Sequence, residues 1–291
     1  MDDELRMKLA DLGSPEALAD CIIAHYPDIN SAVPLARITE ALGIVEIAGC
    51  DTGSFEAVLV TNNAKSTGTI SYNENSHRDR QRYSIAHELG HYLLPFHGEN
   101  AQCAKADMGV IKAKHSNQER EAEANRFAAA LLMPQKLFKA DLRRLRNPEI
   151  GQIVTLAERY KVSKEACARR YTELHDHLCA VVFSRKGVVR YAPRKPDFPF
   201  IEVAKGQPLP PNSLSAKGGG SVGFISNWSE MSAGVWLAAS ARIRGKQLYE
   251  QYLVQADDYR MTMLTLDDVP DEDEPDEDEE LESSWTPRFR R

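Results

Sequence analysis

The residues His87-Glu88-Leu89-Gly90-His91 match the pattern H-E-x-x-H within an apolar, helix-forming stretch. Residues four apart lie on one face of an α-helix, so His87 and His91 can present two imidazole nitrogens to one metal ion. Glu88 follows the first ligand, where it can take a proton from a metal-bound water and pass it to a leaving amine. These residue types at this spacing are typical of zinc peptidases.

Two features of the same helix argue against a chance pair of surface histidines. Gly90 costs about 1 kcal/mol relative to alanine inside a helix, so a small residue here indicates close packing against a neighbour. Ile85, Leu89 and Leu93 also give the helix an apolar side. The histidines therefore occupy a defined face.

A catalytic zinc ion requires a third protein ligand and one open position. Residues 117–132 predict a strong helix that ends before Pro134. Glu121 and Asn125 lie one turn apart on this helix. We assign Glu121 as the third ligand and Asn125 as an acceptor for the free ring N–H of a ligand histidine. The alternative is a solvated acidic helix face.

The two segments Arg82–His91 and Glu121–Pro134 together resemble the ImmA/IrrE metallopeptidases, most clearly over residues 30–135 and more weakly to residue 180. The resemblance implies a gluzincin-like fold and site-specific cleavage of a helix-turn-helix transcriptional repressor, often after DNA damage. It also implies that His87, His91 and Glu121 bind Zn²⁺ and that Glu88 is the general base.

Composition is that of a water-soluble protein with an acidic C-terminal segment. The chain has 291 residues and contains no apolar run that approaches the roughly 18 residues of a membrane span. The acidic N-terminus lacks a signal-peptide pattern, which predicts a cytoplasmic protein with no membrane partner. Residues 267–282 include twelve acidic residues, without which the formal net charge changes from −7 to +5. We expect residues 267–291 to be a disordered tail that either aids solubility or covers a basic groove.

The five cysteines are widely spaced and form no C-x-x-C pattern, which argues against a disulfide framework or a structural zinc knuckle. Cys103 lies between the two predicted metal-binding helices, in a segment that we expect to be a loop. One hypothesis is that its thiolate occupies the open zinc position and holds the enzyme latent. The alternative is an idle or buried thiol.

Three folded parts are predicted, which together make an α+β protein: a peptidase domain (1–135), a basic helical segment (136–178) and a mixed α/β domain (179–266). In the first part, residues 45–47, 57–60 and 68–72 predict strands. The last of these precedes the metal-binding helix, where we expect an edge strand that holds an extended substrate.

The helical segment resembles a helix-turn-helix in which Ser163 caps the second helix. Its functional interpretation is DNA contact by Lys161, Lys164, Arg169 and Arg170. The alternative is a packing motif that joins two domains.

The third part begins with a predicted hairpin that turns at Lys186-Gly187. Residues 222–225, 234–238 and 261–266 predict further strands, whereas residues 248–255 are ambiguous between strand and helix. By resemblance to the radiation-response branch of the family, this part is expected to be a GAF-like sensor domain.

Taken together, these patterns predict a zinc endopeptidase that cleaves a helix-turn-helix repressor and thereby derepresses a stress, DNA-damage or mobile-element operon. Tyr83 and His115 are the candidate oxyanion donors. Single-stranded DNA is the candidate activator, because basic helices and aromatic residues such as Trp236 can bind phosphates and stacked bases. The alternatives are a DNA-binding regulator with a structural zinc site and a toxin-type protease of broad specificity.

Overall fold

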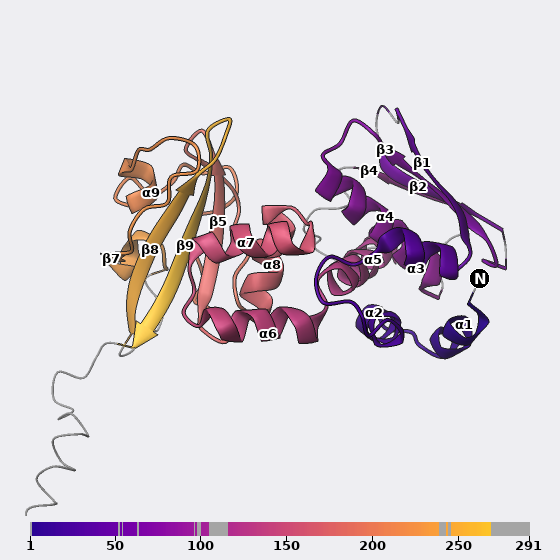
Figure 1. The fold of residues 1–291 in the computed structure, drawn as a ribbon. Helices are drawn as coiled ribbons and strands as arrows, with labels where there is room; N and C mark the ends of the chain where they lie inside the picture. Colours follow the sequence, from indigo (N-terminus) through magenta and orange to yellow (C-terminus); the bar gives the residue numbers. More distant parts are fainter. Residues whose placement is uncertain are drawn as a thin grey trace, which may run out of the picture.

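The computed structural model describes residues 2–51, 53, 55–62, 64–95, 97, 100–104, 116–238, 243 and 246–268. It has the predicted α+β composition, with two sheets and a set of helices between and around them (Figure 1). The helices are α1 (Asp3–Ala10), α2 (Pro15–His25), α3 (Leu35–Ala41), α4 (Arg78–Leu93), α5 (Ser116–Leu132), α6 (Gln135–Leu145), α7 (Ile150–Tyr160), α8 (Lys164–Leu174), α9 (Leu214–Lys217) and the 3-10 turn η1 (Ala233–Val235). The strands are β1 (Ile44–Cys50), β2 (Phe55–Thr61), β3 (Gly68–Asn73), β4 (Asn100–Ala104), β5 (Cys179–Arg185), β6 (Val188–Tyr191), β7 (Ser229–Met231), β8 (Lys246–Val254) and β9 (Tyr259–Asp268).

The N-terminal sheet has the strand order β1-β3-β2-β4. Strand β3 pairs in parallel with β1 and antiparallel with β2, so both of its edges are used. The expectation that the strand before the metal-binding helix is an edge strand is therefore wrong. Among the strands that the structure describes, β4 and β1 lie at the edges of this sheet, and β4 pairs antiparallel with β2.

Helix α4 packs closely against α5. A Cβ atom built on Gly90 would lie 3.2 Å from the backbone Cα of Ala124 and 3.0 Å from Cδ1 of Phe127. Both neighbours are completely buried, so neither has room to move away. The glycine that costs helix propensity therefore permits the contact between the two helices, as its position within the motif predicted.

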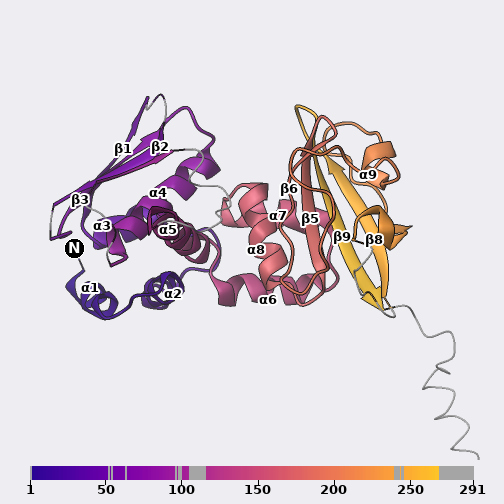
Figure 2. The ribbon, with the colours of Figure 1, turned by 180° about the vertical axis from the view of Figure 1, so that it is seen from behind.

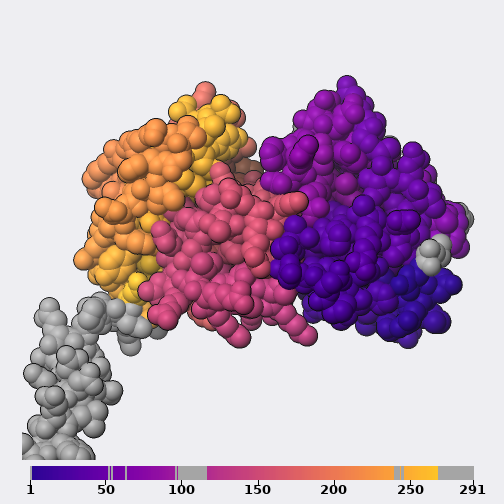
Figure 3. All heavy atoms as spheres, in the orientation of Figure 1, coloured from indigo at the N-terminus to yellow at the C-terminus, as the bar shows by residue number. Residues whose placement is uncertain are grey.

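Helices α6, α7 and α8 lie between the C-terminal sheet and the helices of the N-terminal part (Figure 1), and Figure 3 shows their atoms at the centre of the molecule. A buried polar group joins α6 to α7, because Asp141 of α6 accepts a hydrogen bond of 2.8 Å from the hydroxyl of Tyr160 and pairs with Arg159 at 2.8 Å. Ser163 caps α8 as predicted, since its hydroxyl accepts a hydrogen bond from the backbone N–H of Ala166. Lys161 ends α7 in a left-handed conformation (φ 51°).

The C-terminal sheet is antiparallel throughout and has the strand order β6-β5-β9-β8-β7. Its first hairpin turns at Lys186-Gly187 as predicted, and both residues have positive φ angles (50° and 72°). The ambiguous segment belongs to strand β8. Two predicted strands are wrong: residues 222–225 make only an isolated bridge to Leu253, and residues 234–238 overlap the 3-10 turn η1.

The two faces of this sheet carry different cores. Val181, Phe183 and Met263 face the helices and join one large apolar cluster that continues into the N-terminal part. Ala180, Val182 and Leu264 face away from them and pack under the segments around η1 and Trp236. Figure 2 shows the helices on one side of the sheet and the segments with α9 on the other. Strand alternation therefore joins this sheet to the rest of the molecule through one face only.

Strand β9 continues through Asp267 and Asp268, so it ends two residues beyond the predicted strand. The rest of the acidic segment, for which disorder was predicted, lies outside the described residues. Across the described helices, none combines the length and the apolar character that a membrane crossing requires.

We expect Gly90→Val to lower the free energy of unfolding by about 1–3 kcal/mol, because the added atoms must displace the α5 backbone or Phe127. Denaturant unfolding of the full-length protein measures the change. The control is Gly13→Val, since an added Cβ at Gly13 meets no atom within 4 Å and should change stability by about 0.5 kcal/mol or less. Equal effects of the two substitutions would contradict the packing role of Gly90.

Candidate metal centre

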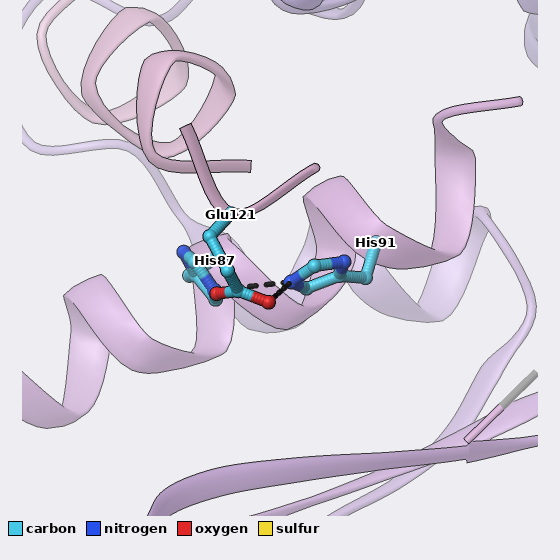
Figure 4. Close-up of side chains that lie close together, drawn as sticks. All are labelled: His87, His91 and Glu121. Carbon is cyan, nitrogen blue, oxygen red and sulfur yellow. Dashed lines mark hydrogen bonds and ion pairs between the residues drawn. The ribbon is translucent and has the colours of Figure 1, made fainter. Parts of the chain in front are cut away.

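Three side chains from α4 and α5 converge on one point (Figure 4). Nε2 of His87 lies 3.1 Å from Oε2 of Glu121, and Nε2 of His91 lies 3.3 Å from Oε1 of the same carboxylate. The two Nε2 atoms are 3.1 Å apart. The structure thus brings together the three residues that the sequence assigned as ligands.

These separations fit a metal ion in tetrahedral coordination. An ion with ligand distances of about 2.0–2.1 Å holds its ligand atoms about 3.3 Å apart. Two neutral imidazoles and one carboxylate are also the donor types found in catalytic sites with an open fourth position. Both histidines are buried, whereas Glu121 is half-buried.

Electrostatics favour a charged carboxylate at this position. Burial by itself acts to raise the pKa of Glu121, but the hydrogen bonds from His87 and His91 hold it well below its usual range. The carboxylate is therefore ionised at neutral pH, as metal binding requires. Glu88 is completely buried beside the first ligand, on the same helix.

Lys65 fixes the end of α4 that carries His91. Its ammonium group donates hydrogen bonds to the backbone carbonyl oxygens of His91 (2.7 Å) and Leu94 (3.1 Å). A cation at a helix C-terminus stabilises carbonyl groups that have no partner within the helix. Arg6 of α1 donates to the carbonyl oxygens of Lys65 and Ser66, so the N-terminal helix holds this loop in place. Sequence reasoning did not identify Lys65, because it lies in a loop far from the motif along the chain.

Residues 45–172 match the IrrE N-terminal-like domain of the Peptidase_M78 family. The similarity is to this domain and covers less than half of the chain. The matched segment includes α4 and α5 and therefore all three candidate ligands. The resemblance to ImmA/IrrE proteins that the two motifs indicated is confirmed.

One solved structure, a transcriptional regulator from Mycobacterium tuberculosis, shares the fold with a TM-score of 0.57. The comparison covers 90% of this chain and 80% of the regulator, at 13% sequence identity. At this level of identity the likeness concerns the fold alone. Among curated proteins, none matches the chain.

A third histidine, His97, contacts His91 at the ring nitrogen that does not face Glu121, and the sequence did not predict this contact. The Nδ1 atoms of His91 and His97 are 2.8 Å apart, and Nε2 of His97 lies 3.0 Å from Oε2 of Glu123. Burial lowers the pKa of His97 to about 4, so its ring is neutral at pH 7. Two features of the sequence could have predicted this contact: His97 lies six residues after His91, and Glu123 lies two residues after Glu121.

Asn125 does not take the predicted place beside a ligand ring. Its side-chain oxygen lies 3.1 Å from the hydroxyl of Tyr83, which donates to it and to the Asn125 backbone carbonyl. The second nitrogen of His91 meets His97, and within the described chain Nδ1 of His87 has no hydrogen-bond partner. The prediction for Asn125 is therefore wrong, because α5 directs this residue toward Tyr83.

Tyr83, proposed from the sequence as an oxyanion donor, is engaged with Asn125 in this structure, and burial raises its pKa to about 12. His115, the other candidate, lies outside the described residues. Cys103 lies in strand β4, paired opposite Ala57, rather than in the predicted loop. The Cys103 side chain lies outside the described part of the protein. The idea that its thiolate occupies the open zinc position therefore remains a hypothesis.

The four residues assigned to DNA contact have different surroundings. Arg170 is buried; its guanidinium donates to the backbone oxygen of Met133 and pairs with Glu173 at 3.0 Å. It is therefore not accessible to a phosphate, and this part of the prediction is wrong. Arg169 lies over the ring of Tyr191 at 4.8 Å. Lys161 is exposed, and Lys164 is half-buried at the start of α8. Helix α8 packs against β5, which favours the packing interpretation of the helix pair.

We expect Lys65→Met to lower the free energy of unfolding by about 1–2 kcal/mol, because two carbonyl oxygens at the end of α4 lose a charged donor. Denaturant unfolding measures this effect. The same substitution at Lys8, whose exposed ion pair with Glu4 contributes little, is the control and should cost about 0.5 kcal/mol or less. If the two variants lose equal stability, Lys65 does not cap the helix.

Proposed function

We propose that this protein is a zinc-dependent, site-specific endopeptidase with a gluzincin-like catalytic domain. The observation that carries the proposal is the convergence of His87, His91 and Glu121 within an M78 peptidase domain. Two imidazoles and one carboxylate form a donor set that suits Zn²⁺ and leaves one position for water or substrate. The buried Glu88 beside these ligands supports hydrolysis rather than a purely structural metal site.

In the proposed reaction, His87, His91 and Glu121 hold Zn²⁺, which supplies a Lewis acid for the attack of water on a peptide carbonyl. Glu88 accepts a proton from the attacking water and passes it to the leaving amine. Burial of both histidines keeps their Nε2 atoms aimed at one point, and the cap by Lys65 keeps α4 from fraying beside His91.

The proposed substrate is a helix-turn-helix transcriptional repressor, whose cleavage derepresses a stress, DNA-damage or mobile-element operon. Support comes from the M78 family match and from the ImmA/IrrE resemblance. Strand β4 supports binding of an extended segment, since it is an edge strand of the N-terminal sheet among the residues described. Backbone pairing at such an edge favours a chain that is locally unfolded over a packed helix.

We further propose that the C-terminal part is a GAF-like sensor that regulates cleavage, with single-stranded DNA as the candidate activator. A cavity of about 820 Å³ lies between α7 and the turn that joins β8 to β9. Its walls include Thr155 and Lys164 from the helices and Val254 and Tyr259 from the sheet. A ligand bound there would touch both parts of the molecule. Trp236 is not available for base stacking, because it is completely buried and its indole N–H donates to Glu250.

The test is a cleavage assay with the purified full-length protein and candidate helix-turn-helix repressors from the same organism. Wild type, Glu88→Gln and Glu119→Gln are compared, each with Zn²⁺ and with or without single-stranded DNA. We expect Glu88→Gln to retain bound zinc but to lose at least a hundredfold in cleavage rate, since it removes the proton acceptor. Glu119→Gln is the matched control, because Glu119 is an exposed acid on α5.

The outcomes separate the proposal from its alternatives. Discrete repressor fragments from wild type and Glu119→Gln, but not from Glu88→Gln, support a site-specific peptidase. Degradation of an unrelated unfolded protein at the same rate would favour a protease of broad specificity. Full derepression by Glu88→Gln in cells, without fragments, would contradict the peptidase proposal and favour a DNA-binding regulator with a structural zinc site.

A further inference from the structure

His97 and Glu123 form a chain of polar contacts that begins at His91. His91 uses Nε2 on the ligand side, facing Glu121, while its Nδ1 lies 2.8 Å from Nδ1 of His97. The far nitrogen of His97 lies 3.0 Å from Oε2 of Glu123. Both rings are buried, with exposed fractions of 2% for His91 and 4% for His97.

These contacts allow one consistent arrangement of protons when His91 is a metal ligand. Its Nε2 must then offer a lone pair, so its proton sits on Nδ1 and is donated to Nδ1 of His97. His97 therefore carries its own proton on Nε2. That N–H donates to the carboxylate of Glu123, which accepts it without any change of protonation.

We propose that His97 and Glu123 are positioning residues that hold His91 in its ligand tautomer and orientation, and thereby strengthen the binding of Zn²⁺. The inference rests on the proposed zinc site and assigns a role to two residues outside the ligand set. Outer partners of this type commonly contribute a factor of about 10–100 to metal affinity.

The placement of the pair in the fold supports this role. His97 follows the end of α4, and Glu123 lies on α5 two residues after the ligand Glu121. The contact between them thus ties the segment after α4 to α5, the helix that supplies Glu121. The Glu123 side chain is 39% exposed, so its charge costs little to keep, while the buried ring of His97 covers the Nδ1 side of His91.

The experiment measures the dissociation constant of Zn²⁺ for the metal-stripped full-length protein, by competition with a chromophoric chelator at fixed pH. This readout does not depend on substrate or on cleavage. His97→Leu removes the acceptor for His91 at similar volume, whereas His97→Asn keeps an oxygen acceptor near the same position. Glu123→Leu removes the carboxylate, and Glu119→Leu, on an exposed face of α5, is its matched control.

We expect His97→Leu to bind Zn²⁺ about 10–100-fold more weakly than wild type, and His97→Asn to recover most of that loss. Glu123→Leu should weaken binding by a smaller factor, and Glu119→Leu should leave it unchanged. Far-ultraviolet circular dichroism of each metal-free protein checks the fold. If His97→Leu is unfolded, the comparison with wild type rests on Glu123→Leu. If Glu123→Leu is unfolded, the comparison rests on His97→Leu.

Wild-type affinity in both His97→Leu and Glu123→Leu would overturn the inference, as would an equal loss in His97→Leu and His97→Asn. Those results would leave the zinc site itself intact. By contrast, if wild type binds no Zn²⁺, or if His87→Ala and Glu121→Ala bind it as tightly as wild type, the proposed metal site fails and this inference fails with it.

Discussion

The close approach of α4 and α5 at Gly90 is the constraint on which the metal centre depends. Two of the three ligand residues belong to one helix and the third belongs to the other, so their convergence requires a fixed distance between the helix axes. With Ala124 and Phe127 directly beneath Gly90, any larger side chain would separate the helices. A few tenths of an ångström at this contact would alter the distances from Glu121 to both histidines, whereas the separation of His87 and His91 is set within α4.

Around this contact, lysine and arginine side chains donate hydrogen bonds to backbone carbonyl oxygens and so fix loops and helix ends near α4. Lys65 binds the end of α4, and Arg6 binds the loop that contains Lys65. Arg82 donates from the start of the motif to the backbone oxygens of Val33 and Lys161, and so ties α4 to the turn between α7 and α8. Since arginine and lysine carry several donors, one side chain can satisfy carbonyl oxygens from distant parts of the chain.

The same turn links α4 to the part of the molecule that contacts the C-terminal sheet. Helices α6–α8 share one apolar cluster with both α4 and the inner face of the sheet, so the two regions are packed through a common core. A buried amide contact adds to this link, because Gln251 of β8 accepts a hydrogen bond from the backbone N–H of Ile150 in α7. These contacts give a physical route by which events at the sheet can affect the helices.

Short sequence patterns predicted the three residues that converge in the candidate metal centre and much of the local structure. The i, i+4 spacing of His87 and His91, the helix that carries Glu121 and the family of the domain all follow from patterns within short segments, because helix geometry fixes which residues share a face. The hairpin at Lys186-Gly187 followed in the same way, from a turn that needs positive φ angles.

Contacts between distant segments could be identified only in the folded structure. It placed β3 inside the sheet, gave His91 the partner His97 instead of Asn125, and buried Arg170 in a helix pair that resembles a DNA-binding motif. Strand order, the direction of a side chain at a helix contact and burial all depend on how distant segments pack. No local pattern encodes that packing, since the same residue types suit a solvated face and a buried one equally well.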